Sequence, residues 1–74
     1  MTDKNDVFEE LQWVKYRLSM LDVIEKKLFA MKKLVQKSQN SNLSKSEIDE
    51  INHKLNNLAA QIKALDQESR KDCI

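Results

Sequence analysis

The sequence predicts an all-α protein whose fold is an antiparallel two-helix hairpin, similar in its packing to a coiled coil. Its 74 residues contain no glycine and no proline, the residues on which the tight turns of β-sandwiches and barrels depend. Apolar residues recur at helical spacing on both sides of one polar break, Ser38-Gln39-Asn40-Ser41-Asn42. The chain is short enough to form one domain only, so residues 1–74 are treated as a single helical hairpin.

The first predicted helix spans residues 6–38. Asp6 can cap its N-terminus, and Glu9, three residues later, can complete a capping box. A start one turn earlier, at Thr2 or Asp3, fits the sequence as well. The last third of this helix holds lysines and no acidic residue, which suits the negative end of the helix dipole.

A short polar turn, residues 39–43, is predicted to join the two helices. A connection of about five residues makes neighbouring helices run antiparallel. Helices often end with one residue in the left-handed conformation, usually glycine. Because the chain has no glycine, we expect Asn40 or Asn42 to take that conformation.

The second helix is predicted to span residues 44–71. Ser44 and Glu47 have the spacing of a capping box, which fixes the start of the helix. Apolar residues then follow in alternating steps of three and four, a pattern typical of a helix that meets its partner along one narrow line. These residues, which we call the seam of the second helix, are Ile48, Ile51, Leu55, Leu58, Ile62 and Leu65.

The first helix has a much broader apolar surface, made of two stripes. One stripe contains Val7, Leu11, Val14, Leu18 and Leu21, and then shifts phase to Ile24, Leu28, Met31 and Val35. The other contains Trp13, Tyr16, Met20, Val23, Ala30 and Leu34. Together they cover more than half of the helix circumference, which is typical of a helix inside a bundle. The narrow seam of the second helix cannot cover so wide a surface.

The uncovered apolar surface predicts self-association. We expect a homodimer in which two hairpins form an antiparallel four-helix bundle with the first helix at its centre. A higher oligomer, or a complex with a different helical protein, would cover the same surface. The residues expected at the interface are Leu11, Trp13, Val14, Tyr16, Arg17, Leu18, Met20, Leu21, Ile24, Leu28, Met31, Ile51, Leu55, Leu58, Ile62 and Leu65.

Aromatic and charged residues near the start of the first helix could add specificity. Phe8, Trp13 and Tyr16 are expected to pack in the core or the dimer interface, although aromatic residues also anchor partner-binding sites. Arg17, four residues after Trp13, could lie on the indole face. Glu10 and Arg17 fall within the apolar surface, and we expect them to pair across the subunit interface or, alternatively, to face another protein.

Binding to an anionic surface is the alternative function. Lys15, Lys26, Lys33 and Lys37 share the polar strip of the first helix and could track phosphates or anionic lipid. However, Asp22 interrupts this lysine row, and the formal net charge of the chain is only +1. We therefore expect a solvated face, and at most weak binding to nucleic acid or anionic surfaces.

The sequence predicts neither an enzyme nor a protein that requires a metal or cofactor. His53 is the only histidine and has no second good ligand at a metal-binding spacing. Cys73 is the only cysteine, so no internal disulfide can form. No run of residues is apolar enough for a membrane span, and the N-terminus is polar, which together favour a cytoplasmic protein. The expected function is protein–protein contact, as an adaptor, regulator or assembly factor.

Overall fold

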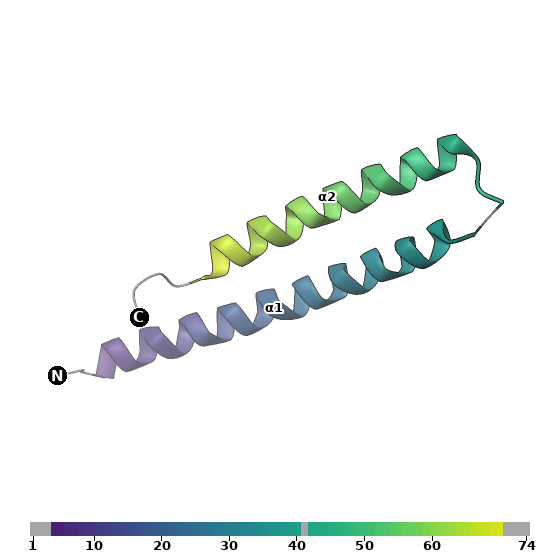
Figure 1. The fold of residues 1–74 in the computed structure, drawn as a ribbon. Helices are drawn as coiled ribbons and strands as arrows, with labels where there is room; N and C mark the ends of the chain where they lie inside the picture. Colours follow the sequence, from purple (N-terminus) through teal and green to yellow (C-terminus); the bar gives the residue numbers. More distant parts are fainter. Residues whose placement is uncertain (1–3, 41, 71–74) are drawn as a thin grey trace.

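The computed structural model of the chain, which describes residues 4–40 and 42–70, contains two helices and no strand in those ranges. Helix α1 (Lys4–Ser38) and helix α2 (Lys45–Ser69) run antiparallel and pack along their length (Figure 1). The Cα atoms extend over 62 × 15 × 13 Å, the dimensions of a thin rod. The predicted all-α hairpin is therefore confirmed for the single chain.

Helix α1 begins at Lys4, two residues before the predicted start, and ends at the predicted Ser38. Asp6 accordingly lies in the first turn of the helix and does not cap it. A carboxylate in the first turn interacts favourably with the positive end of the helix dipole. The alternative starts, Thr2 and Asp3, lie outside the described residues. With 35 residues, α1 is about 52 Å long.

The described residues of the turn between the helices include no left-handed residue. The Gln39 amide donates to the Gln36 carbonyl (3.3 Å), and the Asn40 amide donates to the Lys37 carbonyl (3.1 Å). The Asn42 amide then donates to the Asn40 side-chain oxygen (3.0 Å). The first two bonds give the Gln36 and Lys37 carbonyls at the end of the helix a donor, and the third uses the Asn40 side chain to stabilise the turn. The prediction of a left-handed residue at Asn40 or Asn42 is wrong, because no described residue has a positive φ.

Helix α2 begins with the predicted capping box. Ser44 is extended (φ −74°, ψ 163°), and its hydroxyl accepts from the Glu47 amide at 3.1 Å. The Glu47 carboxylate accepts from the Ser44 amide at 3.3 Å. Two amides that the helix leaves without a partner are thus satisfied, and the boundary is fixed by local chemistry. At the other end Arg70 is extended and ends the helix, and the predicted last residue, 71, lies outside the described residues.

The seam of α2 faces α1. Ile51 is only 4% exposed, and Leu55, Leu58, Ile62 and Leu65 are half-buried. Ile48, at the end near the turn, remains 40% exposed. Because the seam is one residue row wide, α2 covers α1 along a single line.

The face of α1 that meets α2 comes mainly from the second predicted stripe. Ile24 is 8% exposed, and Lys27 donates from Nζ to the Gln61 Oε1 at 2.7 Å across the two helices. The first predicted stripe divides: Ile24 and Met31 turn toward α2, and its other members stay exposed. The apolar residues of α1 that are buried or half-buried are Met20, Val23, Ile24, Ala30, Met31 and Leu34.

Candidate interaction surface

A row of aliphatic side chains on α1 is left in solvent by the hairpin. Each member is at least 40% exposed, and Leu18 reaches 60%. The members follow one another in steps of four and three, and Glu25 and Lys32 occupy the two positions that complete the spacing. We call this surface the outer row; its aliphatic members are Val7, Leu11, Val14, Leu18, Leu21, Leu28 and Val35.

The outer row is exposed because of its angular position on α1. Successive residues of a helix are separated by about 100°. The outer row is therefore rotated by roughly 120° from the residues that meet α2, such as Met20 and Ile24. A second helix contacts its partner along one seam and cannot also reach a row so far around the axis. A second binding partner is needed to remove these side chains from water.

The aromatic pair Trp13 and Tyr16 is exposed for a different reason. Both residues lie on the side of α1 that faces α2, but α2 ends before it reaches the N-terminal part of α1 (Figure 1). Its last residue, Ser69, bonds to Arg17, one residue beyond Tyr16. The two rings meet edge to face, with centroids 5.8 Å apart and planes at 78°. Trp13 is 40% and Tyr16 41% exposed. Among the described residues, the hairpin thus leaves this pair as an aromatic patch at its open end.

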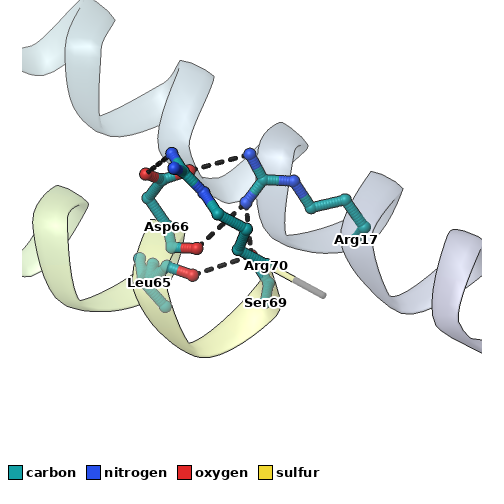
Figure 2. Close-up of polar contacts among 5 residues, drawn as sticks. All are labelled: Arg17, Leu65, Asp66, Ser69 and Arg70. Atoms are coloured by element: carbon teal, nitrogen blue, oxygen red, sulfur yellow. Dashed lines mark hydrogen bonds and ion pairs between the residues drawn. The ribbon is translucent and has the colours of Figure 1, made fainter. Parts of the chain in front are cut away.

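Arg17 binds the end of α2 and does not stack on Trp13. Figure 2 shows its guanidinium reaching across to Asp66 and Ser69. Nη2 donates to the Asp66 carboxylate at 2.7 Å, and Nη1 donates to the Ser69 hydroxyl at 2.7 Å and to the Asp66 carbonyl at 3.2 Å. The hydroxyl of Ser69, which is only 1% exposed, donates a hydrogen bond to the Leu65 carbonyl at 2.8 Å. Arg17 therefore fastens α1 to the last turn of α2.

The carboxylate of Asp66 is held in its charged form by two arginines. The hydrogen bond from Arg17 lowers the pKa of Asp66 below its ordinary value, and the nearby positive charge of Arg70 lowers it further. The Arg70 guanidinium donates to the second carboxylate oxygen of Asp66 at 2.6 Å. The side chains of Arg17 and Asp66 are 29% and 30% exposed, so solvent weakens this ion pair.

This cluster was not found by sequence reasoning, which paired Arg17 with Glu10 across a subunit interface. The structure gives Arg17 its partners within the chain, in Asp66 and Ser69. The sequence could have predicted the Arg17–Asp66 pair, because folding the chain about the turn between Ser38 and Lys45 brings these two residues level with each other.

Two phenylalanines border the outer row and enlarge its apolar surface. Phe8 is 61% and Phe29 56% exposed. The Lys33 ammonium lies over the Phe29 ring, 4.8 Å from its centroid. Phe29 also lines a shallow hollow with Leu28 and the charged residues around it, including Glu25. Sequence reasoning overlooked Phe29 because it belongs to neither of the two stripes.

The lysine row predicted for anion binding is exposed on α1. Lys26 pairs with Asp22 one turn before it, at 3.2 Å. Lys33 lies over Phe29, as described above, so two of the four lysines already have neighbours within α1. His53 is exposed on α2 and lies beside an ion pair between Lys54 and Glu50, at 3.2 Å.

The surface of the described residues can contact another molecule through apolar and charged side chains. In residues 4–40 and 42–70, no three His, Cys, Asp or Glu side chains come close enough together to hold a metal ion. Neither of the two described helices is long and apolar enough to cross a membrane. No family model, curated protein or solved structure matches the chain. The outer row runs from Val7 to Val35, nearly the full length of α1.

Proposed function

We propose that the protein self-associates through the outer row and acts by protein–protein contact, as an adaptor, regulator or assembly factor. In the proposed homodimer, two hairpins form a four-helix bundle with the two α1 helices at its centre. The observation that carries the proposal is the exposure of seven aliphatic side chains in heptad spacing on a helix whose opposite stripe is already covered. The proposal involves no catalytic step, metal or cofactor.

Heptad spacing favours a helix as the covering partner. Residues that alternate in steps of three and four form one straight seam, which fits between the side chains of a second helix. The row runs from Val7 to Val35, nearly the full length of α1. Each aliphatic side chain that becomes fully buried contributes about 1 kcal/mol, since roughly half of its surface is covered already. A second copy of α1 presents a seam of the same length and spacing.

The proposed location of the protein in the cell is based on its cysteine content. The chain has one cysteine, so a fold held by internal disulfides is not available to it. We therefore place the protein in the cytoplasm as part of the proposal. A different helical protein could use the same seam, and the anion-binding alternative would use the lysine row on another face of α1.

Substitution of Leu18 tests the proposal. Leu18 is 60% exposed in the hairpin and sits near the middle of the outer row. Leu18→Asp places a charge in the proposed interface, so we expect the dimer to dissociate while most of the helix signal in circular dichroism remains. Ser19→Asp is the matched control, because it adds the same charge to the neighbouring exposed residue on the polar strip.

Light scattering on a sizing column distinguishes the outcomes. The proposal predicts twice the chain mass of 8.7 kDa for the wild type and Ser19→Asp, and a lower mass for Leu18→Asp. A wild-type mass of one chain at high micromolar concentration would rule out self-association. Binding of the monomer to anionic vesicles or nucleic acid, lost at high salt, would then favour the lysine row.

A further inference from the structure

Two positions of the outer row are charged, and these charges restrict which partner can cover the row. Glu25 and Lys32 occupy the same heptad position as Leu11 and Leu18, nearer the C-terminus of α1. Within residues 4–40 and 42–70, neither charge forms an ion pair or a side-chain hydrogen bond. Both lie in the path of the apolar seam. Whatever covers the row must therefore accommodate one negative and one positive charge at fixed places.

A parallel pair of α1 helices accommodates these charges badly. In a two-fold symmetric parallel pair, every seam residue faces its own counterpart. Glu25 would then face Glu25 of the second copy, and Lys32 would face Lys32. Like charges brought together at an interface repel and lose hydration. Two of the seam positions would oppose association.

We infer that two copies of α1 meet antiparallel, with the two-fold axis passing between Leu18 and Leu21. The inference rests on the proposed self-association and specifies its geometry. In this register Leu18 lies level with Leu21 of the second copy, and Leu11 lies level with Leu28. Symmetry repeats both pairs, so leucines meet leucines on either side of the axis. The most apolar part of the outer row is thereby placed at the centre of the interface.

The same register brings opposite charges together. Glu25 comes within one helical turn of Arg17 of the second copy, and Lys32 comes within one turn of Glu10. Arg17 donates three hydrogen bonds to Asp66 and Ser69, and a guanidinium has five N–H groups. Arg17 therefore binds its own α2 and keeps donors for a carboxylate from the second copy.

Neighbouring antiparallel registers fit less well. A shift of one heptad in one direction sets Leu21 against Glu25 of the second copy. The opposite shift sets Leu28 against Lys4 and shortens the overlap of the two rows. Either shift keeps only one of the two leucine–leucine pairs and sets a leucine against a charged residue, which costs desolvation of the charge. In the inferred register the charged residues Glu25 and Lys32 lie level with the smaller Val14 and Val7, and both leucine–leucine pairs are kept.

Cysteine cross-linking tests the orientation directly. Leu11→Cys and Leu28→Cys are made separately in a Cys73→Ser background and are oxidised alone and as an equimolar mixture. In the inferred geometry, positions 11 and 28 of different copies are level. Two cysteines at position 11 are about 25 Å apart along the axis, beyond the roughly 7 Å that a disulfide can bridge between Cα atoms. We expect cross-linking in the mixture and little in either single variant.

The outcomes separate this inference from the proposed self-association. Cross-linking of each single variant with itself, together with a dimeric mass, would show a parallel dimer and overturn the orientation alone. A dimeric mass without cross-linking in any sample would overturn the register. A mass of one chain for the Cys73→Ser protein would contradict self-association itself, and with it the inference.

Neutralising Glu25 is an independent test, because it should change the dimer dissociation constant in opposite directions for an antiparallel and a parallel dimer. In the antiparallel dimer, Glu25→Gln removes two attractive pairs with Arg17, and we expect the dimer dissociation constant to rise about threefold. In a parallel dimer, the same change removes a repulsion and lowers that constant. Glu68→Gln is the control for a lost carboxylate, because Glu68 is exposed on α2. A tighter Glu25→Gln dimer would overturn the inferred geometry.

Discussion

The inner and outer apolar rows of α1 differ in how they are covered, although both follow helical spacing. The inner row meets α2 of the same chain and is buried or half-buried; its members are Met20, Val23, Ile24, Ala30, Met31 and Leu34. The outer row, which includes Leu18, has no partner in the described hairpin and is exposed. The difference shows that a broad apolar helix can satisfy one stripe within its chain and still carry a second stripe that is available to another molecule.

The comparison predicts different responses to mutation. A change on the inner row or on the seam of α2 should destabilise the hairpin at every protein concentration. A change on the outer row should act through association, so that its effect depends on concentration.

The largest expected effect is on the inner contact. Ile51 is 4% exposed, the lowest value of any apolar residue in the described chain. Ile51→Ala should lower the free energy of unfolding by about 3 kcal/mol, because it removes buried methyl groups and leaves a gap against α1. Urea unfolding followed by circular dichroism measures this loss. His53→Ala, on the exposed side of α2, is the control and should change little; equal losses would mean that the seam is assigned wrongly.

A smaller effect is expected at the cap of α2. Ser44→Ala removes the acceptor for the Glu47 amide and should cost about 1 kcal/mol of the free energy of unfolding. Ser46→Ala, within the exposed first turn, controls for the loss of a hydroxyl. An unchanged urea midpoint for Ser44→Ala would show that the capping box does not stabilise the helix.

The smallest effect concerns the polar link between the helix ends, and it depends on pH. The pKa of Asp66 is lowered in the folded chain, so its charged form stabilises the fold above the ordinary carboxyl pKa. This stabilisation is lost as the pH falls through the lowered pKa. Asp66→Asn should remove that part of the acid dependence, whereas Asp49→Asn, at an exposed position of α2, should retain it. Identical thermal midpoints of the wild type and Asp66→Asn at neutral and acid pH would contradict this role.

Local patterns in the sequence were sufficient to predict α2. The Ser44–Glu47 capping box depends on residues three apart, and the seam from Ile51 to Leu65 allows only one buried face. The structure confirms both, because neither depends on distant parts of the chain. The turn was predicted in position but not in conformation, since neither Asn40 nor Asn42 is left-handed and the Asn42 amide donates to the Asn40 side chain.

The sequence could not predict in the same way which apolar residues of α1 face α2 and which stay exposed. Its apolar surface is so broad that periodicity permits several faces, and only pairing with α2 selects Met20 and Ile24 for the inner row. The link from Arg17 to Asp66 likewise depends on the register of the two helices. The sequence analysis expected Leu11, Val14, Leu18, Leu21 and Leu28 at an interface; the structure shows them exposed, and their role in self-association remains a prediction.

The mass of the wild-type protein in solution as a function of concentration tests the role of the outer row most directly. Sedimentation equilibrium from low to high micromolar concentration should show a shift from the 8.7 kDa chain toward twice that mass. A mass of one chain across the whole range would show that the outer row does not bind a second copy.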